Sequence, residues 1–123
     1  MAVKKDANTE LPVPSEWRNV LEQIANAFVE NNFPTEPLKS HLGQYRESII
    51  AINQANIKNY PDEIGLLNSK SWDTSCYLWM EDSWDVLLDL SDENGETTDL
   101  VLHVTVKENA DSFIFEPYLI YVP

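Results

Sequence analysis

Glycine, cysteine and basic charge are scarce in this sequence, and each shortage excludes a class of protein. The 123 residues include only three glycines, so no glycine-rich loop is available to hold a phosphate or a dinucleotide. The single cysteine, Cys76, excludes a disulfide within the chain. Residues 71–123 contain one basic residue, Lys107, whereas nucleic-acid backbones are bound through Lys and Arg. We therefore expect no direct contact with nucleic acid.

Long apolar runs are absent as well. No window approaches the roughly 18 consecutive apolar residues of a membrane span. No apolar segment follows Lys4 and Lys5, as a signal peptide would require. We expect a soluble, cytoplasmic protein that does not bind membranes. Hydrophobic residues still make up 43% of the chain, which is enough for the core of one domain of this length.

Residues that could form a catalytic or metal centre are few and isolated. His41, His103 and Cys76 lie far apart in the sequence, whereas a zinc site needs three or four converging ligands. Cys76 has no basic neighbour in sequence to lower its pKa, so we interpret it as a buried, inert thiol. No Gly-x-Ser-x-Gly turn presents a nucleophilic serine. We expect no enzyme activity, no metal and no cofactor.

The first half of the chain has the pattern of helices. Residues 1–14 are polar and proline-punctuated and are interpreted as a flexible arm, which leaves 15–123 as a single domain. Ser15 is a suitable N-cap, and apolar residues then recur at three- and four-residue steps up to Phe28, which predicts an amphipathic helix. A second helical region begins near Thr35. Gly43 weakens it, so either one helix or two short helices fit that region.

From Trp72 onward the apolar period changes to two, which indicates strands. We expect strands at 75–81, 84–90, 98–107 and 112–122. Helices followed by strands predict an α+β fold, with N-terminal helices on one face of an antiparallel meander of about four strands.

The turn around Gly95 sets the expected register of the two central strands. A three-residue loop pairs Asp92 with Glu96 and aligns the apolar rows, so that Leu88 faces Leu100. In this register Asp85 and Asp89 point away from the helices. They share the outer face with His103, Thr105 and Lys107.

Acidic charge is the strongest compositional signal. The chain has 21 acidic and 8 basic residues, a net charge of −13, and no Lys or Arg occurs from Trp72 to Val106. One interpretation is that the charge keeps a small protein in solution. The other is an acidic binding face, because the charge is concentrated in the strand half.

Two resemblances to known families suggest functions. The order of elements resembles the NTF2-like (cone-shaped α+β) domains, with an opening helix that ends in AFVENNF (27–33), a second helical region and a closing meander. Size, acidity, lack of a signal peptide and the final strand segment EPYLIYV (116–122) also resemble small acidic immunity proteins of bacterial contact-dependent growth inhibition and related polymorphic toxin systems. The second resemblance implies a cytoplasmic protein that binds and blocks a cognate toxin domain, often a basic nuclease.

The resulting hypothesis is an immunity protein whose acidic strand face, roughly Glu81 to Asp99, meets the positive cleft of a toxin. Tyr77 and Trp79 are candidate aromatic anchors, although core packing also fits Trp79. The expected partner contacts are Tyr77, Trp79, Glu81, Asp82, Asp85, Asp89, Asp92 and Glu93. An alternative is an NTF2-like ligand-binding or enzymatic domain with a pocket between helices and sheet, but the acid/base pair of enzymatic members has no counterpart at matching positions. A third is a DNA mimic.

Overall fold

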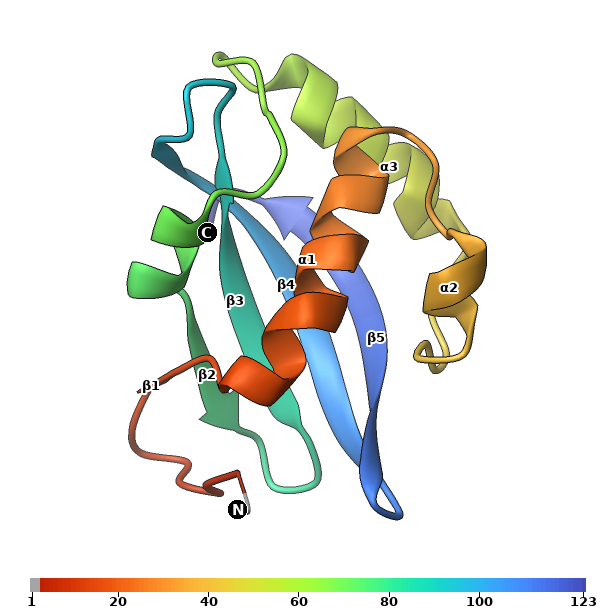
Figure 1. Cartoon of the computed structure of the whole chain (residues 1–123), viewed down its shortest axis with the longest axis vertical. Coiled ribbons are helices and arrows are strands. Elements are labelled where there is room, and N and C mark those ends of the chain that lie inside the picture. Colours follow the sequence, from red (N-terminus) through yellow and green to blue (C-terminus); the bar gives the residue numbers. More distant parts are fainter. Residues whose placement is uncertain (1–2) are drawn as a thin grey trace.

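Helices from the first half of the chain cover a five-stranded antiparallel sheet in the computed structural model, which describes residues 3–123 (Figure 1). The fold is α+β, as the sequence predicts. The strands lie in the order β1-β2-β3-β4-β5, so each pairs with its neighbour in sequence. The elements are β1 (Leu11–Pro12), α1 (Ser15–Val29), α2 (Glu36–Lys39), α3 (Ser48–Asn59), the 3-10 helix η1 (Ser69–Asp73), β2 (Cys76–Trp79), β3 (Trp84–Ser91), β4 (Thr97–Asn109) and β5 (Ser112–Tyr121).

Helix α1 packs its apolar stripe on one face of the sheet and fills the core (Figure 1). Trp17 has no exposed surface, and its ring makes edge-on contacts with Tyr77, Trp84 and Phe113 at 5.3–5.5 Å between ring centroids. Such aromatic pairs add to the free energy gained by burying their area. The inner rows of β3 and β4 complete this core, and their buried members are Trp84, Val86, Leu88, Leu90, Leu100, Leu102, Val104 and Val106.

The second helical region is two short helices, separated by a segment that pairs with the sheet. Between α2 and α3, the amide of Gly43 donates to the carbonyl of Phe115 (3.0 Å), and the amide of Phe115 donates to the carbonyl of His41 (2.9 Å). A Cβ atom at Gly43 would overlap the side chains of Glu116 and Ile114. An alanine here would force these two side chains to move, so glycine, the residue that weakens the helical pattern, allows the close approach.

The β3–β4 turn has the predicted form, but the strands beyond it are displaced by two residues. The amide of Asp92 donates to the carbonyl of Glu96 (2.8 Å), and Gly95 has the positive φ of 82°. Further along, Leu88 pairs with Leu102 rather than Leu100, because the register shifts between Asp89 and Ser91. A shift of two residues keeps every side chain on its predicted face. Asp85 and Asp89 thus lie on the outer face, as expected.

Helix α3 covers the free edge of β5 through side-chain amides. Asn53 is fully buried; its Nδ2 donates to the carbonyl of Tyr118 (2.8 Å), and its Oδ1 accepts from the amide of Ile120 (2.8 Å). The Nδ2 of Asn56 donates to the carbonyl of Ile120 (2.7 Å). These carboxamides take the positions that backbone groups of a further strand would occupy, so the edge hydrogen bonds of β5 are satisfied by a helix.

The N-terminal segment differs from the expected flexible arm in having defined contacts. Leu11 and Pro12 pair with Tyr77 and Cys76 as a short edge strand, and Val13 is buried. Farther toward the N-terminus, Trp84 Nε1 donates to the carbonyl of Lys4 (2.9 Å). The sequence pattern missed these contacts because two residues of strand carry no detectable periodicity. No helix in residues 3–123 is long and apolar enough to cross a membrane.

Candidate functional site

The eight residues predicted as partner contacts do not form one patch. Tyr77 and Trp79 lie on the helix-covered side of the sheet, because Trp79 pairs with Trp84 of the inner row. Tyr77 is only 5% exposed, and Trp79 is half-buried, 5.0 Å from Trp84 between ring centroids. The Nζ of Lys5 lies 5.1 Å from the ring centroid of Trp79. Both aromatic residues are thus part of the core or its border rather than of the face that carries Asp85.

Asp85 and Asp89 lie on the outer face of β3 and have partners within the chain. Asp85 Oδ1 lies 3.4 Å from His103 Nε2, and both side chains are less than one-third exposed. Asp89 accepts a hydrogen bond from the hydroxyl of Thr74. Tyr121 continues the cluster, since its hydroxyl lies 3.5 Å from His103 Nδ1. The polar groups of this outer-face cluster are therefore largely engaged with one another.

Glu81 and Asp82 lie in the β2–β3 turn, at the opposite end of β3 from Asp92 and Glu93. Both are exposed, and Glu81 has a positive φ of 74°. Eight residues of strand separate the two turns, which is about 26 Å at roughly 3.3 Å per residue. The predicted acidic face is therefore a line along one strand with a dense group at one end.

That dense group forms because the loop after α3 packs against the β3–β4 turn. The amide of Glu93 donates to the carbonyl of Glu63 (2.9 Å), and the amide of Gly65 donates to the carbonyl of Ser91 (3.0 Å). We call the acidic residues gathered there the acidic end; they are Asp62, Glu63, Asp92, Glu93, Glu96 and Asp99. Within residues 3–123, Lys70 is the one basic side chain that pairs with this group, through Glu96 at 3.1 Å.

Asp92 also holds the turn in place. Its Oδ1 accepts hydrogen bonds from the amides of Asn94 and Glu96, both at 2.9 Å. The carboxylate therefore satisfies two turn amides that have no strand partner. Asp92, one of the predicted partner contacts, thus has a structural role in the turn. Asp62, Glu63 and Glu93 are exposed and have no such role.

An exposed leucine lies within the acidic end. Leu66 is 56% exposed, although its neighbour Leu67 is buried. Leu66 lines a shallow hollow of about 440 Å³ together with Asp92, Glu93 and Asn94. An exposed apolar side chain beside charged and polar groups is typical of a protein–protein contact. Sequence analysis missed it because the Leu66-Leu67 pair lies in a loop, where no periodicity tells the buried leucine from the exposed one.

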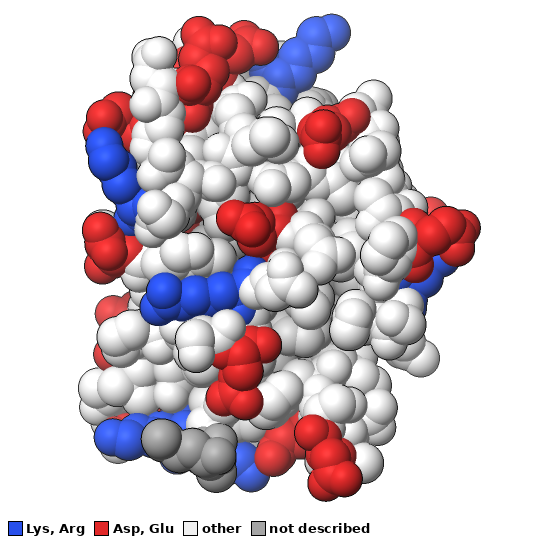
Figure 2. All heavy atoms as spheres, viewed as in Figure 1, with Lys and Arg blue, Asp and Glu red and all other residues white. Residues whose placement is uncertain are grey.

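Acidic groups on the helix-covered face lie apart from one another. Figure 2 shows this face with acidic atoms in separate groups, with basic side chains and broad uncharged areas between them. One group lies at the end where Figure 1 places the β3–β4 turn and the loop after α3. The acidity of the sequence is therefore not spread evenly over this side of the molecule.

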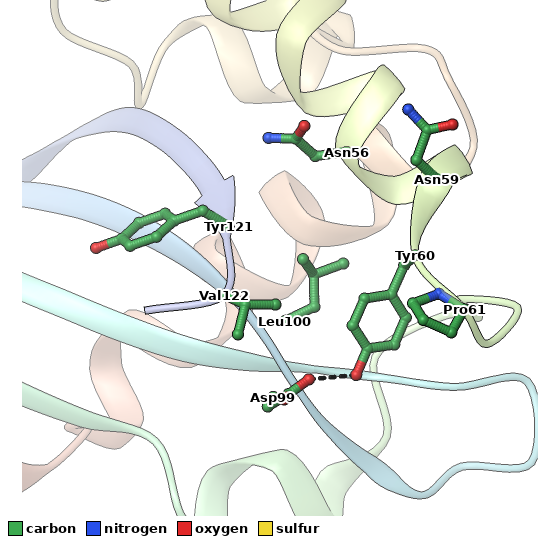
Figure 3. A pocket seen from close by; sticks show the side chains of 8 residues that line it. All are labelled: Asn56, Asn59, Tyr60, Pro61, Asp99, Leu100, Tyr121 and Val122. Atoms are coloured by element: carbon green, nitrogen blue, oxygen red, sulfur yellow. Dashed lines mark hydrogen bonds between the residues drawn. The ribbon is translucent and has the colours of Figure 1, made fainter.

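An open groove of about 520 Å³ lies beside the acidic end, between the C-terminus of α3 and the ends of β4 and β5 (Figure 3). Tyr60 forms one wall, and its hydroxyl donates to Asp99 Oδ1. This hydrogen bond to a carboxylate raises the pKa of the Tyr60 phenol. Val122 supplies apolar surface, whereas the ring of Tyr121 points away from Asp99 (Figure 3).

Cys76 has the character of an unreactive thiol. Burial and the neighbouring carboxylate of Glu10, whose Oε2 lies 3.3 Å from the sulfur, raise the pKa of Cys76 to about 12. A thiol protonated to that degree is a poor nucleophile and metal ligand. Within residues 3–123, no three His, Cys, Asp or Glu side chains are grouped to hold a metal ion.

Comparison with known proteins identifies a family. A family model described as "Domain of unknown function (DUF7668)" matches residues 25–123. No curated protein and no solved structure gives a significant match to the chain.

Proposed function

The chain belongs to this family of unknown function, DUF7668, and from its geometry we propose that it is a binding protein that neutralises a partner by covering it. The partner proposed is a cognate toxin domain with a basic surface, such as a nuclease, and the chain is its cytoplasmic immunity protein. The observation that carries this proposal is Leu66, exposed at 56%, in a shallow hollow that it shares with the carboxylates of Asp92 and Glu93.

The acidic end suits a basic partner on electrostatic grounds. Opposite fields speed the encounter of two proteins, and close charge pairs across an interface can couple by about 1.5–7 kcal/mol. A toxin that cleaves nucleic acid needs a positive cleft to bind phosphate. Carboxylates placed in that cleft would exclude the substrate without any chemistry by the inhibitor.

The structure changes which residues we assign to the contact. Asp85 and Asp89 bind His103 and Thr74 within the chain, so their charges are partly engaged. Tyr77 is buried. We therefore centre the contact on Glu93 and Asp92 of the predicted set and add the carboxylates of the loop after α3, with Leu66 as the apolar anchor. Glu81, Asp82 and Trp79 lie about one strand length away and are not assigned to this contact.

The test uses a purified basic toxin domain that this chain neutralises and measures their association by stopped flow. The charge-reversal pair Glu63→Lys and Glu93→Lys should slow association at least tenfold at low ionic strength and less at high ionic strength. Glu16→Lys with Glu47→Lys makes the same change in net charge elsewhere on the surface and is the matched control. Equal effects of both pairs would show that only total charge matters, and an unchanged rate for both would refute the proposal.

Leu66→Ala tests the anchor separately. Loss of a central apolar side chain mainly speeds dissociation, so this variant should release the partner at least tenfold faster while the association rate stays within twofold. Loss of toxin neutralisation by Leu66→Ala in a growth assay would connect binding to function. Retained neutralisation with wild-type dissociation would remove Leu66 from the contact.

The alternative, an NTF2-like ligand-binding or enzymatic domain, needs a pocket beneath the helices. In the described residues the space between α1 and the sheet holds the packed side chains of Trp17, Phe28 and Leu88, all fully buried. The groove of Figure 3 is open and lies at the end of the sheet instead. Binding through the surface is therefore the better supported function.

A further inference from the structure

The groove beside the acidic end combines three kinds of group that bind cations: a carboxylate, an aromatic ring and carboxamide oxygens. Asp99 is exposed and carries the negative charge, while the hydrogen bond from Tyr60 occupies only part of the accepting capacity of its two oxygens. The flat ring of Tyr60 forms a wall next to this carboxylate (Figure 3). None of the residues that line the groove is Lys, Arg or His.

Two carboxamides lie on the α3 side of the same groove. Asn56 uses its Nδ2 to bind the carbonyl of Ile120, which leaves its Oδ1 as an acceptor. Asn59 also lines the groove, and its side chain extends from the last turn of α3 (Figure 3). The groove therefore offers carboxamide acceptors on the α3 side, the carboxylate of Asp99 and apolar surface from Val122.

We propose that this groove binds the guanidinium group of an arginine side chain from a basic protein partner, with Asp99 as its counter-ion and the ring of Tyr60 as its stacking surface. The inference deepens the proposed function, on which it rests, by naming how the partner is held beside the acidic end. Planar guanidinium groups bind carboxylates in a bidentate manner and stack on aromatic faces. The aliphatic part of the arginine would contact Val122, which is 52% exposed.

The form of the groove favours arginine over other occupants. An anionic ligand would be repelled by Asp99 and by the neighbouring carboxylate of Asp62. A purely apolar ligand would leave the remaining accepting capacity of Asp99 and the Oδ1 of Asn56 unsatisfied in a closed contact, which is unfavourable. A lysine ammonium would satisfy the charge but would use the flat ring and the several acceptors less well.

The experiment titrates the isotopically labelled protein with N-acetyl-arginine amide and follows the amide signals by NMR. Saturable shifts are expected for the side-chain amides of Asn56 and Asn59 and for the backbone amides of Leu100 and Val122. N-acetyl-citrulline amide has nearly the same shape without the charge and should bind at least tenfold more weakly. N-acetyl-lysine amide should also bind more weakly than the arginine compound.

Variants then separate this groove from general acidity. Asp99→Asn keeps a hydrogen-bond acceptor for Tyr60 and should weaken arginine binding at least tenfold. Asp62→Asn removes one charge nearby but outside the groove lining, and should change the binding constant less than threefold. Tyr60→Phe removes the hydroxyl, keeps the ring and releases Asp99, so it should bind at least as tightly as the wild type.

The proposal is overturned if citrulline and arginine compounds bind equally, if lysine binds as tightly as arginine, or if shifts spread over all acidic residues. It is also overturned if Asp99→Asn and Asp62→Asn have the same effect. These results are independent of neutralisation. If the groove binds arginine but the protein blocks no toxin, this inference stands and the proposed function is rejected. If the protein blocks a toxin but the groove does not bind arginine, the proposed function stands and this inference is rejected.

Discussion

Replacement of Asn53 by alanine tests how the sheet edge is held by α3. The change removes both hydrogen bonds of the Asn53 side chain to β5. The Ile120 amide is then left unpaired in a site with no exposed surface, which costs about 1–3 kcal/mol. The carbonyl of Tyr118 belongs to a half-exposed residue and can bind water, so it adds less. We expect a total loss of about 2–4 kcal/mol.

This loss is large compared with the total stability of a typical domain, about 5–15 kcal/mol. Urea unfolding followed by tryptophan fluorescence should show a lower midpoint with an unchanged slope. The melting temperature should fall by about 4 °C per kcal/mol, or roughly 8–16 °C. Hydrogen exchange measured by NMR should show that the Ile120 amide loses protection more than amides in β3.

Asn59→Ala is the matched control, because Asn59 lies exposed in the last turn of the same helix and undergoes the same chemical change. It should be neutral or slightly stabilising, since alanine favours helices. The reasoning is refuted if Asn53→Ala lies within about 0.5 kcal/mol of the wild type, a margin the size of an ordinary surface substitution. Unchanged protection of the Ile120 amide would refute it equally.

Four further predictions concern other parts of the fold. The pKa of Cys76 is raised from 9.0 to about 12, so its thiol should react with iodoacetamide at pH 8 about 1,000-fold more slowly in the folded chain than in the urea-unfolded chain. Glu10→Gln should speed the reaction of the folded chain. Equal rates in the folded and unfolded chains would contradict this prediction. The same shift stabilises the fold fully below pH 9, and that contribution should be lost from pH 9 towards 12 in pH-dependent unfolding measurements. Asp92→Ala should lower the unfolding free energy by about 1–2 kcal/mol in urea because two turn amides lose their acceptor; an unchanged midpoint would exclude that role. Gly43→Ala should cost about 1–3 kcal/mol through overlap with Glu116 and Ile114, measured by thermal unfolding, and a wild-type melting temperature would show that the loop adapts.

Much of the fold could be predicted because its signals are periodic. The spacing of Trp17 to Phe28 gives α1, and the alternation in β3 and β4 gives the inner and outer faces. The predicted register is two residues wrong beyond the turn, because a bulge near Leu90 leaves no trace in an apolar pattern of period two. The carbonyl of Leu90 accepts from Thr98 Oγ1 (2.9 Å), a side-chain bond that no pattern of apolar residues reveals.

The candidate site was less predictable than the fold. The acidic charge of the strand half predicts a binding face there, and Asp92 and Glu93 of the predicted set belong to the acidic end. The loop that supplies Glu63 and Leu66 is distant in sequence, and only backbone hydrogen bonds bring it to the β3–β4 turn. Tyr77 and Trp79 alternate with Cys76 and Leu78, so the sequence leaves open which row faces inward. Pairing of Trp79 with Trp84 decides it.

The attachment of α3 also determines how this protein would begin to unfold. Only Ile49 and Asn53 of α3 are buried, whereas α1 buries seven residues. Segments with few buried contacts open at lower free energy than the rest of a domain. When α3 detaches, the sheet keeps its core but β5 presents free amides and carbonyls, which is a template for strand pairing between molecules. Aggregation on mild heating would therefore start from a nearly native species with one helix released, well before the tryptophan core is exposed.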